Sequence, residues 1–352
     1  MSTFFSPKYR SLVPYTPGEQ PRDMQYIKLN TNESPFPPSP KAIETASAAM
    51  GKLHLYSDPT AKALREAMAQ TLGVSPDEVI LTNGSDEVLN FAFMAYCDAD
   101  HPAVFADITY GFYPVFADIN NLPKTVLPLR DDFTLSVDDY IQTKGTVFIA
   151  NPNAPTGLCL PVSEIERLVA SAPHRMVVID EAYIDFGGES CVPLTKKYHN
   201  LLVTGTFSKS RSMAGARLGF GVANREIIRD LDTIRYSTNP YNVNSMTMAA
   251  GIGCLSDDAY TRENCEKIIE AREYTTKELT KLGFVTTDSR TNFVFAMHPR
   301  LDGEAFYLAL KARGILVRHF SSPKIAQYNR ITIGTMEQMK VFVETTKEIL
   351  GK

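Results

Sequence analysis

Short, nearly continuous runs of apolar residues recur along the middle of this chain, and segments with helical spacing separate most of them. Strands of this kind are typical of a parallel sheet that is covered on both faces. The predicted strands are 79–82, 103–106, 125–129, 146–150, 176–180, 201–204 and 218–222, and predicted helices begin near 85, 111 and 161. The pattern therefore predicts an α/β fold whose large domain has three layers around a mainly parallel central sheet.

Both ends of the chain depart from this alternation. The first 40 residues are rich in proline and polar residues, which favours an extended arm, whereas the charged segment 257–282 predicts a bridging helix to a smaller α+β domain. We expect the arm and the start of the small domain over 1–40, the large domain over 41–255, and the bridging helix with the small domain over 256–352. Further predicted elements are helices over 40–50, 60–72, 303–313 and from 336, and strands over 292–297, 315–318 and 330–333.

The composition narrows the class of protein. The chain has 352 residues, of which 44% are hydrophobic and 22% are charged, as is usual for globular proteins. Its net charge is only −4 and it has no basic block, so we expect no nucleic-acid partner. The six histidines are scattered without the spacing of metal ligands, and we expect no metal.

Cysteine usage and the apolar runs bear on the location of the protein in the cell. The five cysteines form no Cys-x-x-Cys pair, and their odd number argues against a complete set of disulfides. We therefore expect a reducing cytoplasm. No uncharged apolar run approaches twenty residues, and the first ten residues lack an apolar signal core, so we expect no contact with a membrane.

Polar residues follow the predicted strands at their carboxyl ends. These segments are 83–86, 109–110, 151–157, 180–183 and 206–209. Each one alone is typical of an ordinary turn, loop or helix cap. Because the carboxyl ends of parallel strands open onto one crevice, we expect the five segments to face a common site.

Together these segments offer the groups that a planar, phosphorylated aldehyde cofactor needs. Lys209 lies just past an apolar strand with Arg217 eight residues on, and burial or a nearby cation makes a lysine amine reactive toward an aldehyde. Asp180 can keep a pyridine nitrogen protonated, and Tyr183 can donate to a ring hydroxyl. The phosphate would be held by amides, hydroxyls and a guanidinium group of Gly84, Ser85, Thr206, Ser208 and Arg217.

The order of these motifs resembles that of the fold-type I pyridoxal-phosphate-dependent aminotransferases over nearly the whole chain. Asn-Ala-Pro-Thr-Gly at 153–157, Asp-Glu-Ala-Tyr at 180–183, Ser-Lys at 208–209 and Arg-Leu-Gly at 217–219 carry the resemblance. Within that superfamily the chain is similar to the histidinol-phosphate aminotransferase family. The segments that carry this closer similarity are 13–15, 29–35, 56–59, 84–87, 180–186 and 330–335.

The resemblance implies pyridoxal 5'-phosphate as the cofactor and a role for each matching residue. Lys209 would form the imine with the cofactor, Asp180 would pair with the pyridine nitrogen, Tyr183 would donate to the ring hydroxyl and Tyr110 would stack on the ring. The remaining expected cofactor contacts are Arg217, Ser208, Thr206, Asn153 and the backbone amides of Ser85 and Asp86.

The resemblance also implies how the substrate and a second subunit would contribute. Tyr56 would reach the cofactor of a neighbouring subunit, so a homodimer with shared active sites is expected. Tyr15 and the Asn32-Glu33 segment would close over the substrate. Arg330 and Arg318 would anchor its anionic end.

The implied activity is transfer of an amino group from a small-molecule donor to a 2-oxo acid. The closer family similarity implies histidinol phosphate as the donor and 2-oxoglutarate as the acceptor. An aminotransferase for phenylalanine or tyrosine is the nearest alternative, because those side chains are similar in size to imidazole. Decarboxylation of threonine phosphate would use the same cofactor apparatus. A cofactor-binding regulator would be expected to lose part of this apparatus or to add a DNA-binding module, and this chain does neither.

One residue departs from the family pattern. The family usually has asparagine immediately before Pro-Thr-Gly, where its amide bonds the ring hydroxyl, and this chain has Ala154. Unless Asn153 or Tyr183 supplies the missing donor, the ionised ring oxygen loses a hydrogen bond. The imine pKa should then be higher than in relatives that keep the asparagine.

We predict that Ala154→Asn lowers the imine pKa relative to the wild type, because the new amide would stabilise the ionised ring oxygen. A spectroscopic pH titration of the two cofactor-loaded proteins measures this directly. Coincident titration curves would rule the idea out.

Overall fold

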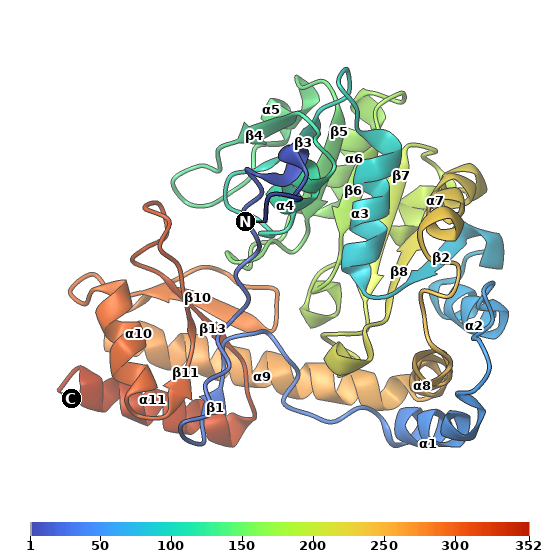
Figure 1. Ribbon diagram of the computed structural model, residues 1–352. Coiled ribbons are helices and arrows are strands. Elements are labelled where there is room, and N and C mark those ends of the chain that lie inside the picture. The colour runs from blue at the N-terminus through green and yellow to red at the C-terminus, as the bar shows by residue number, and fades with distance from the viewer. Residues whose placement is uncertain (1, 352) are drawn as a thin grey trace.

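A seven-stranded sheet forms the centre of the computed structural model, which describes residues 2–351 (Figure 1). The strand order is β2-β8-β7-β6-β5-β3-β4, and β8 runs antiparallel to both of its neighbours while the other pairs are parallel. The mainly parallel sheet expected from the sequence is confirmed. The strands are β2 (Val79–Thr82), β3 (Ala103–Ala106), β4 (Lys124–Leu127), β5 (Thr146–Ala150), β6 (Val177–Asp180), β7 (Leu201–Thr206) and β8 (Gly219–Val222).

Helices cover both faces of this sheet because successive strand residues point in opposite directions. In β6, Val178 packs into an apolar cluster with α3, α4 and α7, whereas Val177 and Ile179 pack into a second cluster with α5 and α6. The helices are α3 (Ser85–Tyr96), α4 (Tyr113–Ile119), α5 (Val137–Ile141), α6 (Val162–Ser171) and α7 (Arg225–Thr238). The three-layer arrangement is therefore confirmed.

A third apolar cluster joins α1 (Pro40–Ala49), α2 (Lys62–Leu72) and α8 (Ser245–Leu255) below the β2 end of the sheet (Figure 1). The sequence pattern missed α8, which is apolar nearly all round and contains two glycines. A Cβ on Gly253 would lie 2.4 Å from the Lys41 carbonyl oxygen, so this glycine allows α8 to pack directly on the backbone of α1. Helix α7 was missed as well.

The small domain is built from both ends of the chain. Its four-stranded antiparallel sheet has the order β12-β13-β10-β9, and β1 (Ile27–Lys28) pairs in parallel with β11 (Ile315–Leu316). The predicted strand over 315–318 is in fact two short strands, β11 and β12 (Arg318–His319), which belong to different sheets. The remaining elements are β9 (Val285–Thr286), β10 (Phe293–Met297), β13 (Asn329–Thr332), α10 (Gly303–Lys311) and α11 (Met336–Ile349).

The long helix α9 (Asp258–Leu282) runs along the base of the molecule from α8 to the small domain, as predicted for the bridging helix (Figure 1). The apolar core that α9 helps to form includes Ala154, Tyr183 and Phe186, which follow β5 and β6 of the large sheet. The two parts of the molecule therefore meet through a continuous core at the carboxyl ends of these strands.

The proline-rich arm crosses between the two parts. It has one short 3-10 helix, Pro7–Tyr9, and is otherwise irregular until β1, as expected. Within residues 2–351, no helix has the length and apolar character needed to cross a membrane. The same residues contain no group of three or more His, Cys, Asp or Glu side chains that could hold a metal ion.

Candidate active site

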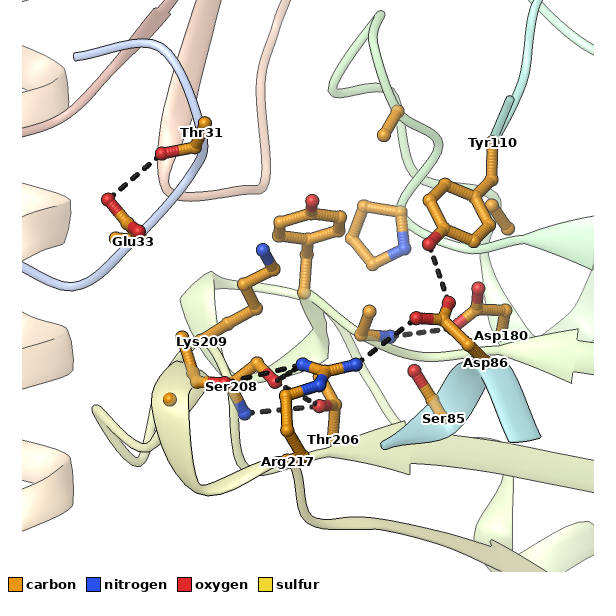
Figure 2. Close-up of a pocket in the computed structure, with 17 residues that line it drawn as sticks. Thr31, Glu33, Ser85, Asp86, Tyr110, Asp180, Thr206, Ser208, Lys209 and Arg217 are labelled. Carbon is orange, nitrogen blue, oxygen red and sulfur yellow. Dashed lines mark hydrogen bonds and ion pairs between the residues drawn. The ribbon is translucent and has the colours of Figure 1, made fainter. Parts of the chain in front are cut away.

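The residues that follow β5, β6 and β7 converge with the beginning of α3 on one cavity of about 360 Å³ (Figure 2). Helix α3 begins directly after Gly84, which has a positive φ of 86°. The helix start lies against Gly219, the first residue of β8, where a Cβ would come within 2.2 Å of the Ser85 nitrogen. The predicted cofactor residues that line the cavity are Ser85, Asp86, Tyr110, Asp180, Tyr183, Thr206, Ser208, Lys209 and Arg217.

One end of the cavity is suited to an anion. Arg217 lies with Nη1 3.4 Å from Ser208 Oγ and Nη2 3.2 Å from Asp86 Oδ2. A Cβ on Gly84 would lie 2.5 Å from Arg217 Nη2, so only glycine lets the guanidinium lie this close to the start of α3. Thr206 donates to Ser208 at 2.9 Å. A helix amino terminus, hydroxyls and a guanidinium together form a phosphate-binding environment.

The cavity also contains a buried carboxylate, Asp180. Asp180 is 5% exposed and accepts only long hydrogen bonds, from the Ala182 amide at 3.2 Å, Tyr113 at 3.4 Å and Thr204 at 3.5 Å. Burial, and then repulsion by Asp86, raises the pKa of Asp180 to about 6. No cation among residues 2–351 forms an ion pair with Asp180. The environment is that of a carboxylate that would be stabilised by a cationic ligand.

Tyr113 was not found by reading the sequence. It is fully buried, and its hydroxyl donates to Asp180 from the first turn of α4. The available signal was its spacing three residues after Tyr110, which places both rings on the same side of the helix start. Their ring centroids are 5.7 Å apart with the planes nearly perpendicular.

Lys209 points its amine into the cavity (Figure 2). Its Nζ lies 5.7 Å from the centroid of the Tyr183 ring, and within residues 2–351 it makes no hydrogen bond or ion pair. The loop is fixed before the lysine by the Ser208 backbone N–H, which donates to Thr206 Oγ1 at 3.1 Å, and after it by Ser210, which donates to Asp185, and Ser212, which donates to Ser34 at 2.8 Å. The amine is therefore held by its backbone and left free to react.

A second cavity of about 350 Å³ adjoins the first and shares Thr31, Tyr110, Ala154, Tyr183 and Lys209 with it. Tyr15, Asn32, Arg318 and Arg330, which were predicted to contact substrate, all line this second cavity.

Arg330 is the clearest anion-binding group there. Its guanidinium lies 5.4 Å from the ring centroid of Phe293 and 5.8 Å from that of Phe320. Nη2 donates to the Asn30 carbonyl at 3.0 Å, while the buried Nε has no partner among the described residues. Burial lowers the pKa of Arg330, which means that its charge is poorly solvated and would gain from an anionic ligand.

Arg318 and Tyr15 connect the second cavity to the arm. Arg318 donates to the carbonyl oxygens of Pro17 at 3.2 Å and Thr16 at 3.1 Å. Tyr15 stacks on Phe112 of the large domain, with ring centroids 4.3 Å apart. The arm therefore lies along the cavity and contacts both parts of the molecule.

Three predicted residues, Gly84, Asn153 and Tyr56, are not among those that line the two cavities. The amide of Asn153 donates to the Ile108 carbonyl at 3.0 Å and to Thr156 at 2.9 Å, and its oxygen accepts from Thr109 at 2.9 Å. All of its polar atoms are thus used locally, and Asn153 does not replace the donor that is missing at Ala154. Tyr56 is 83% exposed and stacks on Tyr241, so within one chain it is not brought to the site.

Comparisons with known proteins agree with this geometry. The family described as aminotransferase class I and II matches residues 24–345. A histidinol-phosphate aminotransferase from Brachyspira hyodysenteriae is 46% identical over 99% of each chain, and one from a Marinomonas strain is 46% identical over 99% of this chain and all of its own. The chain belongs to the histidinol-phosphate aminotransferase family. It is an aminotransferase of a family whose cofactor is pyridoxal 5'-phosphate.

Solved structures share the fold. The histidinol-phosphate aminotransferase from Sinorhizobium meliloti in complex with pyridoxal-5'-phosphate superposes with a TM-score of 0.89 at 23% identity, covering 99% of both chains. An aspartate aminotransferase variant from Thermus thermophilus gives 0.84 at 19% identity. These values confirm the fold-type I architecture expected from the sequence.

The cavity fits pyridoxal 5'-phosphate. The buried, unpaired Asp180 suits the cationic ring nitrogen, the free amine of Lys209 suits the aldehyde, and Arg217 with the start of α3 suits the phosphate. The particular role of each residue stays a prediction.

We predict that Asp180→Asn stabilises the cofactor-free protein more at pH 8 than at pH 5. A carboxyl whose pKa is raised on folding binds its proton more tightly in the folded state, so it destabilises that state as the pH rises through about 4 to 6. Asparagine does not titrate. The difference in unfolding free energy between variant and wild type should grow by about 1 kcal/mol from pH 5 to pH 8.

Urea unfolding at the two pH values measures this difference. Asp132→Asn is the control, because a hydrogen bond from Thr134 lowers the pKa of that exposed carboxyl. The difference in unfolding free energy between this variant and the wild type should not grow from pH 5 to pH 8. An equal difference for Asp180→Asn at both pH values would contradict the prediction.

Proposed function

We propose that this protein transfers the amino group of histidinol phosphate to 2-oxoglutarate and releases imidazole acetol phosphate and glutamate. The observation that carries the proposal is the position of the Lys209 amine, which borders both the cofactor cavity and a cavity lined by two arginines. Relatives that are 46% identical over nearly the whole chain and are named histidinol-phosphate aminotransferases support the choice of substrate.

Bound pyridoxal 5'-phosphate supplies an aldehyde that joins an amine covalently and a ring that accepts electrons from the carbon bearing that amine. Asp180 would keep the ring nitrogen protonated, since its buried carboxylate would be stabilised by that positive charge. No described residue occupies the Lys209 amine with a hydrogen bond or an ion pair. It would take the proton from the substrate carbon that bears the amino group and give it to the cofactor carbon that was the aldehyde, so that the amino group stays on the cofactor.

Arg330 binds the anionic end of both substrates. The donor ends in a phosphate and the acceptor in a carboxylate, and a planar guanidinium can hold either with paired hydrogen bonds. Its partial burial between Phe293 and Phe320 strengthens the attraction by excluding water. Tyr15 on the arm covers the same cavity.

The substrate proposal predicts a preference of about tenfold or more in kcat/KM for histidinol phosphate, equivalent to about 1.4 kcal/mol of binding in the transition state. The test compares histidinol phosphate, phenylalanine, tyrosine and threonine phosphate with 2-oxoglutarate, and follows glutamate and carbon dioxide. Lys209→Ala is the control and should show no turnover. Equal use of phenylalanine or tyrosine would indicate an aromatic aminotransferase, and carbon dioxide from threonine phosphate would indicate a decarboxylase.

We propose in addition that two copies of the chain form a homodimer with shared active sites. The connection between α1 and α2 exposes a group of large apolar side chains, which is unusual for a monomer. These side chains are Met50, Leu53, Leu55 and Tyr56. Burying them against a second copy would bring Tyr56 to the cofactor cavity of that copy.

The dimer proposal predicts that two inactive variants restore activity when they are mixed. Tyr56→Ala and Lys209→Ala should each be impaired. After they are unfolded and refolded together, each hybrid dimer has one site with both residues intact, so activity should reach about a quarter of the wild-type value. Light scattering checks that dimers form. A mixture no more active than the average of its components would contradict shared sites.

We propose that the large domain spans residues 41–255 and that the segments on either side of it form the small domain. We also propose that the protein is located in the cytoplasm. The location is supported by free thiols, which reducing compartments preserve. The free cysteines are Cys97, Cys159, Cys191, Cys254 and Cys265.

A further inference from the structure

The side-chain amide of Asn32 is held in one orientation at the junction of the two cavities. Asn32 is 1% exposed, and its Nδ2 donates to the Tyr183 hydroxyl oxygen at 2.9 Å. Its Oδ1 accepts from the hydroxyl of Thr332 at 3.0 Å, and the same hydroxyl accepts the Asn32 backbone N–H at 3.0 Å. The backbone oxygen of Asn32 accepts from Asn292 at 3.0 Å. Every polar group of this residue is therefore satisfied.

This arrangement decides what the Tyr183 hydroxyl can do. A phenol has one proton to donate, and its oxygen here already accepts the amide of Asn32. No described residue accepts the Tyr183 proton, and that side of the residue borders the cofactor cavity. Accepting one hydrogen bond also makes a hydroxyl a stronger donor of the next.

No other side chain among residues 2–351 is placed to donate from the neighbouring loop. The nearest position there, Ala154, is apolar, 5% exposed and packed in the same apolar core as Tyr183. The amide of Asn153 is spent on Ile108 and Thr156 and lies outside both cavities. The Tyr183 hydroxyl is thus the sole phenol or amide donor left for a ring oxygen on this side of the cavity.

We propose that Asn32 is a positioning residue that acts through Tyr183, aiming the tyrosine proton at the ring oxygen of the bound cofactor. This inference rests on the proposed function, because it requires that the cavity bind pyridoxal 5'-phosphate. The residues that fix Asn32, Thr332 at the end of β13 and Asn292 just before β10, belong to the small domain, whereas Tyr183 follows β6 of the large sheet. The position of the small domain therefore sets the strength of a hydrogen bond inside the cofactor cavity.

The test is a spectroscopic pH titration of the cofactor-loaded protein without substrate, which reports the pKa of the nitrogen that joins Lys209 to the cofactor. A hydrogen bond to the ionised ring oxygen is stronger when the nitrogen has lost its proton. It therefore stabilises the deprotonated form and lowers the pKa of that nitrogen. Asn32→Gly should raise the pKa by about 0.5–1 unit, the size of one weakened hydrogen bond. Glycine is chosen because Asn32 has a φ of 55°.

A double-mutant cycle separates action through Tyr183 from a general disturbance. Tyr183→Phe should raise the pKa by more than Asn32→Gly does, and Asn32→Gly should cause no further shift in the Tyr183→Phe background. Thr332→Val should give a smaller shift in the same direction, because it frees the Asn32 amide without removing it. Thr346→Val is the matched control, since that buried threonine bonds only Phe342 within α11 and should cause no shift.

The outcomes distinguish the two proposals. If Tyr183→Phe leaves the pKa unchanged, the role of Tyr183 in the proposed site is wrong. If Tyr183→Phe raises the pKa and Asn32→Gly does not, or if Asn32→Gly shifts it equally in both backgrounds, the inference about Asn32 is overturned. If the Asn32→Gly variant does not bind the cofactor, Asn32→Asp serves as a second variant that keeps the shape of the side chain. If this carboxylate does not raise the pKa of the nitrogen that joins Lys209 to the cofactor, the inference is likewise overturned.

Discussion

The burial of Asp180 is the constraint on which the site depends. Its carboxylate lies at the end of a central strand, with the Tyr113 and Thr204 hydroxyls and one amide as weak partners, and burial raises its pKa to about 6. A fold that keeps an unpaired carboxylate in this position sacrifices stability there unless a cation arrives. The same cavity also contains the Lys209 amine, the anion-binding groups around Arg217, and the rings of Tyr110 and Tyr183.

The second organising feature is the meeting of the two domains over that carboxylate. Ala154, Tyr183 and Phe186 leave the large sheet and pack into the core of the small domain, so the edge of the cofactor cavity is also part of the domain interface. Arg330 and Asn32 come to the substrate cavity from the small-domain side, and the arm crosses above them through Tyr15. The two cavities thus share a wall of only a few residues.

The strand-end motifs allowed most of the cavity to be predicted before the structure. Asp180, Ser208 and Lys209 lie at or just after the ends of parallel strands, and the geometry of the sheet brings them together. Arg217 instead precedes β8, which runs antiparallel, so the start of β8 lies at the same edge. Asn153 shows the limit of that argument. It stands beside the right motif, but its amide is consumed by Ile108, Thr109 and Thr156, which only the folded loop reveals.

The sequence by itself determined the three-layer architecture, the cofactor class and the family, because apolar periodicity and motif spacing are local properties of the chain. Only the tertiary structure decided that Thr332 and Asn292 orient Asn32, that Tyr113 supports Asp180, and that α8 packs on α1 through Gly253. Asn32 and Thr332 are 300 positions apart in the chain. Hydrogen bonds over such separations depend on how the two domains pack against each other. The sequence around either residue contains no pattern that predicts its partner.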